Sequence, residues 1–286
     1  MTETAPAPDP GPPPAPPPTR PEAGTRGSSP ISLGTRPDRA MVLAAGRGQR
    51  LRPITDSLPK PLVEIAGRTL LDRVLDRLAD AGIARAVVNA HHLADRLAAH
   101  LDARPDDATP AVDLVREPTL LETGGSVAAA LPRLGTAPFF VANADALWLD
   151  GPTPALARLA AAWDDEAMDA LLLLVRAPEA VGMEGPAAEA ADFFLDPEGR
   201  ARRRPPGAVA PFFYGGVQLV HPRLLGGAPD PAGGGYSMVP LWDAAEAAGR
   251  LWGVVHDGAW FHVGTPAALE EVSRLFDPHF IRWVEP

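Results

Sequence analysis

The sequence contains no cysteine. This absence excludes disulfide bonds, iron–sulfur clusters, thiolate zinc sites and cysteine nucleophiles, and it is typical of the reducing cytoplasm. Long apolar runs are also missing. The densest run, Leu171–Val175, has the length of a strand and not the roughly 18 residues of a membrane-spanning helix. Because the N-terminus has neither the basic nor the apolar region of a signal peptide, we expect a cytoplasmic protein with no membrane partner.

Basic residues are scarce relative to acidic ones. The chain of 286 residues has 26 Lys and Arg against 36 Asp and Glu, which gives a formal net charge of −10. This charge argues against a general nucleic-acid binder. A phosphate ligand would therefore have to be held by a local group of cations and backbone donors.

Proline is abundant, but it is unevenly placed. The chain has 35 prolines, and 12 of them lie within residues 1–38. That stretch has almost no apolar residue to bury, so it cannot offset the entropy lost on ordering. We expect a disordered, polyproline-like tail over 1–38 and one folded domain over 39–286.

From residue 40 onward, short apolar runs alternate with segments of helical spacing. Such alternation predicts right-handed βαβ crossovers and an α/β fold with a doubly wound, mostly parallel sheet. Ligands of such sheets bind outside the carboxyl ends of the strands. We expect the second half to complete the sheet and to add a lobe that faces the substrate. The predicted strands are 40–45, 86–89, 112–115, 139–142, 170–175, 212–220 and 253–255, and the predicted helices are 69–81, 93–101, 125–131, 239–248 and 266–276. Thr69, with Asp72 three residues on, is expected to cap the first helix, and Gly82 to end it.

A glycine-rich loop directly follows the first predicted strand. Gly46 and Gly48 would let backbone N–H groups approach an anion, and Arg50 and Lys60 place positive charge beside them. Other phosphate loops fit less well, because a dinucleotide fingerprint needs a third glycine where Leu51 stands and a Walker A loop needs Gly-Lys-Ser/Thr. The neighbouring Arg47 and Arg52 are equally compatible with surface charges and with ligands.

The sequence Gly-Arg-Gly-Gln-Arg-Leu-Arg-Pro-Ile-Thr at 46–55, followed by Pro-Lys-Pro at 59–61, resembles the sugar-1-phosphate nucleotidyltransferase family. The resemblance spans roughly 39–276. Residues 117–125 and 263–266 are most similar to the branch of that family that acts as N-acetylmuramate-1-phosphate uridylyltransferases in cell-wall recycling. The resemblance implies a Rossmann-like, GT-A-like fold. Because the sequence ends at Pro286, we do not expect the left-handed β-helix domain that bifunctional members of the family carry.

The resemblance also implies roles for the residues of the loop. Arg50 and Lys60 would be catalytic, with Arg50 on the leaving pyrophosphate and Lys60 between the α-phosphate and the sugar phosphate. A sugar phosphate is largely dianionic at pH 7, since its second pKa is about 6. The reaction therefore needs charge neutralisation and alignment and no general base. The implied nucleotide-binding residues are Gly46, Gly48, Gln49, Arg50, Lys60, Glu117 and Glu122, the last two bordering the base.

The metal and sugar sites are implied in the same way. Asp145 would bind Mg²⁺, the expected cofactor. His262 stands where relatives carry a second metal-binding aspartate, which is a departure from the family pattern. Asn143 would contact the sugar substrate. Arg203 and Arg204 stand near an acidic residue of relatives that bind neutral sugars, so they favour an acidic sugar if they face the pocket. An exposed charged turn over 200–204 is the simpler interpretation.

The leading hypothesis is an Mg²⁺-dependent enzyme that makes UDP-N-acetylmuramate and pyrophosphate from UTP and N-acetylmuramate 1-phosphate. One alternative keeps the chemistry and changes the substrates, giving a mannose-1-phosphate guanylyltransferase or a glucose-1-phosphate thymidylyltransferase. Another is a silent regulatory protein that binds nucleotide sugars, which only His262 favours. We expect a monomer that does not bind nucleic acid.

Overall fold

The computed structural model describes residues 1, 37–184 and 190–277. The predicted tail over 1–38 therefore lies almost entirely outside the described residues. Within the described part of the chain, no helix is both long enough and apolar enough to cross a membrane.

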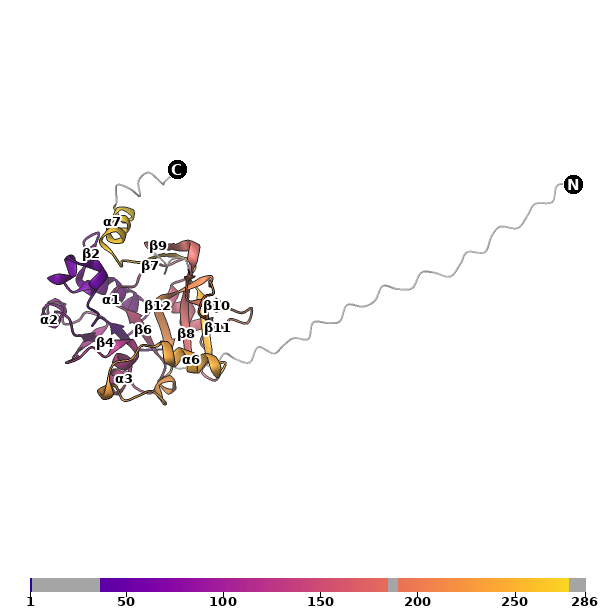
Figure 1. Cartoon of the computed structure of the whole chain (residues 1–286), viewed down its shortest axis with the longest axis horizontal. Coiled ribbons are helices and arrows are strands. Elements are labelled where there is room, and N and C mark those ends of the chain that lie inside the picture. Colours follow the sequence, from indigo (N-terminus) through magenta and orange to yellow (C-terminus); the bar gives the residue numbers. More distant parts are fainter. Residues whose placement is uncertain (2–36, 185–189, 278–286) are drawn as a thin grey trace. The chain divides into compact units, whose positions relative to one another are not determined.

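The folded region alternates strands and helices as the sequence predicts (Figure 1). The helices are α1 (Leu70–Asp80), α2 (Ala94–Asp102), α3 (Glu122–Leu134), α4 (Ala155–Ala162), α6 (Val239–Ala247) and α7 (Pro266–Leu275). The strands are β1 (Arg39–Leu43), β2 (Glu64–Ile65), β3 (Arg68–Thr69), β4 (Arg85–Ala90), β5 (Ala111–Arg116), β6 (Phe139–Asn143), β7 (Leu147–Leu149), β8 (Ala170–Arg176), β9 (Ala180–Val181), β10 (Phe193–Leu195), β11 (Ala201–Arg203), β12 (Phe212–Val220), β13 (Leu251–Val255) and β14 (Ala259–Phe261).

One large sheet organises the domain. Its first half consists of β5, β4, β1 and β6, which are all parallel, so their carboxyl ends lie along one edge. Strand β12 joins β6 in the antiparallel sense, β8 follows β12, and β13 lies parallel to β8. The predicted doubly wound, mostly parallel sheet is confirmed, with β12 as the antiparallel strand between the two halves.

Helices cover both faces of this sheet. One core cluster packs α1, α2 and α4 against the first face, and a second packs α3 and α6 against the other. Strand β6 contributes to both, since Phe140 belongs to the first cluster and Phe139 to the second. This alternation is what a strand buried on both faces requires.

A small second sheet lies beside the large one. In it, β14 pairs with β7 in the antiparallel sense and with β9 in the parallel sense. Because Phe261 lies opposite Leu147, the residues before β7 and after β14 come close together. Asp145 and His262, which are far apart in sequence, meet in this way.

Two local predictions have different outcomes. The predicted cap of α1 is confirmed, because the Thr69 hydroxyl accepts a hydrogen bond from the Asp72 N–H at 3.0 Å and Gly82 follows the helix with φ +80°. The predicted charged turn over 200–204 is wrong at its centre. Residues 201–203 form β11, which pairs with β10, and Ala201 is buried in the second core cluster.

Candidate active site

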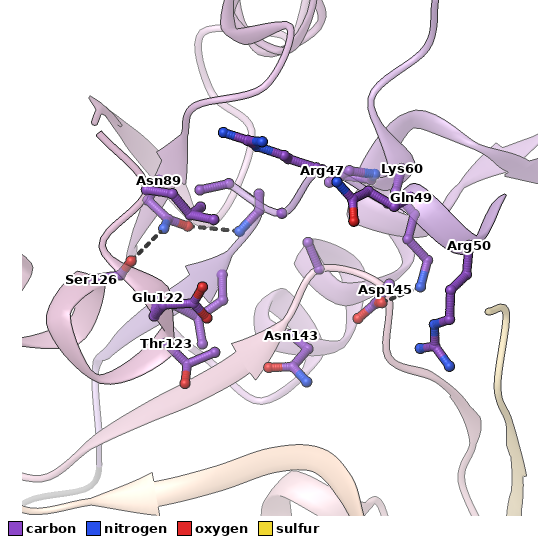
Figure 2. Close-up of a pocket in the computed structure, with 18 of the residues that line it drawn as sticks. Arg47, Gln49, Arg50, Lys60, Asn89, Glu122, Thr123, Ser126, Asn143 and Asp145 are labelled. Carbon is purple, nitrogen blue, oxygen red and sulfur yellow. Dashed lines mark hydrogen bonds and ion pairs between the residues drawn. The ribbon is translucent and has the colours of Figure 1, made fainter. Parts of the chain in front are cut away.

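A cavity of about 720 Å³ opens at the carboxyl ends of β1 and β6. This is the edge where a doubly wound sheet is expected to bind its ligand. The cavity is lined by the loop after β1, by Lys60, by the first turn of α3 and by the residues that follow β6. Figure 2 shows the polar side chains among them: Arg47, Gln49, Arg50, Lys60, Asn89, Glu122, Thr123, Ser126, Asn143 and Asp145.

The loop after β1 forms a cradle of backbone donors. Gly48 has φ +60°, and a Cβ atom there would lie 2.9 Å from Cγ2 of Thr55, so glycine is required. The Thr55 hydroxyl donates to the Gly48 carbonyl at 2.8 Å and fixes the loop. The N–H groups of Gly46, Arg47 and Gly48 donate to no acceptor within the described residues. Such a concave run of free N–H groups is suited to an anion.

Two guanidinium groups stand free at the cavity. Neither Arg47 nor Arg50 has a hydrogen bond or ion pair with any described residue, and both side chains are exposed. In Figure 2 they extend from the loop in opposite directions. Arg52 differs, because its Nε lies 3.0 Å from the Asp56 carboxylate and the pair is exposed. The structure therefore places Arg47 with the cavity and Arg52 outside it.

Lys60 and Asp145 form an ion pair at the cavity wall. Lys60 begins a short 3-10 helix (Lys60–Leu62) between two prolines, which orients its side chain. Burial alone would raise the pKa of the Asp145 carboxyl, but the Lys60 ammonium outweighs it and the pKa lies below its ordinary value. Asp145 is therefore ionised at neutral pH and can neutralise a cation.

His262 lies beside this pair, as its predicted position requires. Burial and the charge of Lys60 lower the pKa of His262, although Asp145 opposes them. The imidazole is therefore neutral at pH 7. It lies over the backbone of Gly264, where a Cβ atom would approach Nε2 to 2.3 Å, and Gly264 itself lines the cavity.

A buried polar network supports the opposite end of the cavity. The Asn89 side chain accepts a hydrogen bond from the Ala44 N–H at 2.7 Å and donates to Glu117 at 2.8 Å and to the Ser126 hydroxyl at 3.0 Å. Glu117 also accepts from the Leu121 N–H at 3.3 Å. Glu117 is buried behind the wall, whereas Asn89 and Ser126 line the cavity. Neither of these lining residues is among those predicted from the sequence.

The remaining predicted residues divide into two groups. Glu122 and Asn143 line the cavity, and Glu122 begins α3 with φ +59°. Arg203 and Arg204 are not among the lining residues. Arg203 pairs with Asp243 at 3.3 Å, and Arg204 donates to the carbonyls of Ala191 and Ala208. Their predicted contact with a sugar thus has no support in the geometry.

Comparison with known proteins identifies the family of the chain. Residues 40–257 match the family model described as the MobA-like NTP transferase domain. The chain belongs to this family. It is therefore an enzyme of the nucleotidyltransferase class, and the resemblance carried by the glycine loop is confirmed.

Relatives within the class are similar over nearly their whole length. An N-acetylmuramate alpha-1-phosphate uridylyltransferase of Caulobacter vibrioides is 42% identical over 84% of this chain and 97% of its own. One of the same name from Neisseria meningitidis is 35% identical over 83% of this chain and 97% of its own. Among solved structures, a UDP-glucose pyrophosphorylase bound to UDP-glucose superposes with a TM-score of 0.68 at 16% identity, over 84% of this chain and 98% of its own. The last comparison supports the fold of the family.

Proposed function

We propose that this protein transfers a uridylyl group from UTP to N-acetylmuramate 1-phosphate and releases pyrophosphate. The observation that carries the proposal is the phosphate cradle at Gly46–Gly48, with Arg50 and Lys60 beside it, in a chain that matches two proteins named for this activity over 84% and 83% of its length and 97% of theirs. Mannose-1-phosphate guanylyltransferases match over a third of the chain or little more, for instance 36% identity over 38% of this chain and 30% of the relative.

The residues suit the chemistry of the transfer. An oxygen of the sugar phosphate attacks the α-phosphorus of UTP, the bond from that phosphorus to the bridging oxygen breaks, and its electron pair leaves with pyrophosphate. The nucleophile is already ionised, so the barrier lies in bringing two anions together in line. Lys60 would lie between the two phosphates, and Arg50 with the loop N–H groups would take the charge of the leaving group.

The metal-binding residues fit Mg²⁺ held mainly by its substrate. No group of three or more His, Cys, Asp or Glu in the described part of the chain could hold a metal by itself. Asp145 offers one ionised carboxylate, and Mg²⁺ commonly uses one or two carboxylates together with substrate phosphates and water. Bound there, the ion would neutralise charge on the nucleotide phosphates. His262 is a nitrogen donor, which Mg²⁺ takes poorly, so we assign it to a phosphate or a water molecule.

The proposal includes a monomer in the cytoplasm, where UTP and a sugar phosphate would both be available. A pyrophosphate-release assay with UTP, dTTP and GTP, each paired with the 1-phosphates of N-acetylmuramate, glucose and mannose, tests the substrates directly. We expect turnover with UTP and N-acetylmuramate 1-phosphate to exceed every other pair. Preference for GTP with mannose 1-phosphate, or for dTTP with glucose 1-phosphate, would replace the proposal, and no turnover with any pair would favour the regulatory alternative.

A further inference from the structure

A segment far from α3 in sequence closes the N-terminus of that helix. We call Gly235–Met238 the strap. The Tyr236 carbonyl accepts from the N–H groups of Gly124 at 2.8 Å and Gly125 at 3.0 Å, and the Tyr236 N–H donates to the Leu121 carbonyl at 3.0 Å. The Met238 N–H donates to the Thr123 hydroxyl at 2.9 Å. Four hydrogen bonds thus join the strap to the turn that lines the cavity.

Glycines on both sides make this approach possible. A Cβ atom on Gly124 would lie 2.6 Å from the Ser237 carbonyl oxygen and 2.7 Å from the Tyr236 ring. One on Gly235 would lie 2.6 Å from the Leu121 carbonyl carbon. Contacts this short with backbone atoms cannot be relieved by a rotamer change. The Tyr236 hydroxyl is buried and has no hydrogen-bond partner in the part of the chain described here, so the strap acts through its backbone.

The strap changes what the first turn of α3 can bind. The free N–H groups at a helix N-terminus favour an anion, and this turn faces the same cavity as the phosphate cradle through Glu122, Thr123 and Ser126. Two of its N–H groups are already bonded to Tyr236, and the Glu122 carboxylate adds a negative charge. This end of the cavity therefore disfavours phosphate, while the cradle at the other end keeps its donors free.

We propose that the strap is the positioning element for the nucleobase: it holds the first turn of α3 against the cavity and reserves that end for an uncharged ring. The inference rests on the proposed function in taking UTP as the nucleotide. The strap thereby sets the orientation of the nucleotide in the cavity, because the phosphates bind at the cradle and are excluded from the first turn of α3. None of the strap residues lines the cavity, so its effect is exerted through the α3 turn.

Two neighbouring glycines provide a matched test. Gly124→Ala must displace the strap, whereas Gly125→Ala brings its Cβ only to 3.3 Å from Cβ of Leu121 and 3.6 Å from the Tyr236 nitrogen. Calorimetric titration of each variant with UTP and with inorganic tripolyphosphate separates the base from the phosphates. For Gly124→Ala we expect the affinity for UTP to fall about tenfold, as for loss of one or two hydrogen bonds, while tripolyphosphate affinity stays unchanged. Gly125→Ala and Tyr236→Phe should bind both ligands as the parent does.

A second pair of variants changes the strap and the loop before it, and this pair can be tested if Gly124→Ala does not fold. Gly235→Ala should reproduce the selective loss of UTP affinity, and Gly233→Ala, where a Cβ would meet nothing within 4 Å, should not. Two results would overturn the inference. One is an equal loss of affinity for UTP and for tripolyphosphate in Gly124→Ala and Gly235→Ala, which would give the strap a structural role only. The other is an unchanged affinity for UTP in both variants. A parent protein that binds tripolyphosphate as tightly as UTP would instead contradict the proposed function, because no base would then be recognised.

Discussion

Replacing Lys60 by methionine separates the catalytic role of its ammonium from its structural role. The substitution keeps the aliphatic stem but removes the partner of Asp145, whose side chain is 34% exposed beside a Lys60 side chain that is 12% exposed. Removing one partner of a fully buried ion pair lowers the free energy of unfolding by about 3–5 kcal/mol. Because water screens the charge of the partly exposed Asp145 carboxylate, we expect a loss of about 1–2 kcal/mol in Lys60→Met. For a domain of this size that is a fall in Tm of about 2–8 °C.

The loss of activity should be much larger than the loss of stability. Removing one preorganised charge from a transition state lowers the rate by about 10²–10³. We therefore expect Lys60→Met to remain folded at 25 °C and to release pyrophosphate at that reduced rate with saturating UTP and N-acetylmuramate 1-phosphate. Arg52→Ala is the matched control, since Arg52 belongs to the same loop but pairs with Asp56 at the surface. It should retain both Tm and rate.

A double variant makes the reasoning refutable. Lys60→Met combined with Asp145→Asn removes the unpaired carboxylate, so thermal denaturation should recover part of the lost Tm while the rate stays low. The assignment of Lys60 fails if the single variant keeps its rate within about threefold of the parent, less than the loss expected for one charge. It fails equally if the double variant regains activity together with stability.

Three further outcomes follow from the structure. Asn89→Leu should destabilise the fold by about 2–4 kcal/mol in urea denaturation, because the Ala44 N–H and two other buried groups lose their partner; a midpoint like that of the parent would contradict the network. Asp169 forms ion pairs with Arg250 and Arg223. Burial alone would raise the pKa of its carboxyl, but the hydrogen bonds from these two arginines outweigh burial and the pKa is lowered. The stabilising effect of Asp169 is therefore present above about pH 4 and is lost as the pH falls below it. The stability deficit of Asp169→Asn at pH 7 should thus shrink toward pH 3, and a constant deficit would count against the ion pairs. His262→Asp should retain or strengthen Mg²⁺-dependent turnover while Asp145→Ala abolishes it; the reverse pattern would mean that the metal site is misplaced.

The phosphate end of the cavity could be predicted because it lies in one continuous stretch. Gly46, Gly48, Arg50 and Lys60 fall within 15 residues, and their types alone suggest an anion site after a strand. Asp145 was named because the family resemblance implied a metal-binding aspartate there, and the structure places it in an ion pair with Lys60 at the cavity wall. The alternation of strands and helices likewise predicted the large sheet, because burial imposes a regular spacing of apolar residues that can be recognised in the sequence.

Short strands and single charges gave less reliable signals. Strands β7 and β9 have three and two residues, too few for a period to show, so their small sheet was not predicted. Arg203 and Arg204 were assigned to the sugar because they are basic residues near a position where relatives that bind neutral sugars carry an acidic one. In the structure their partners are a carboxylate on α6 and two backbone carbonyls, and no local pattern could have indicated the contact between Arg203 and Asp243, which the fold brings together.

At the base end of the cavity, the family resemblance implied Glu117 and Glu122, but the contacts that support this end could not be predicted, for a related reason. Its wall is assembled from Asn89 on β4, Glu117 after β5, Ser126 on α3 and the strap, and the bond between Met238 and Thr123 spans 115 residues. In sequence, Asn89 is a polar residue at the end of an apolar run, Ser126 is one of many small helical residues, and the glycines before Tyr236 indicate only a loop. Each becomes informative when its hydrogen-bond partner is known. A cation signals an anion site by itself, whereas the polar groups at this end of the cavity are paired with one another, and those pairings are made by the tertiary fold.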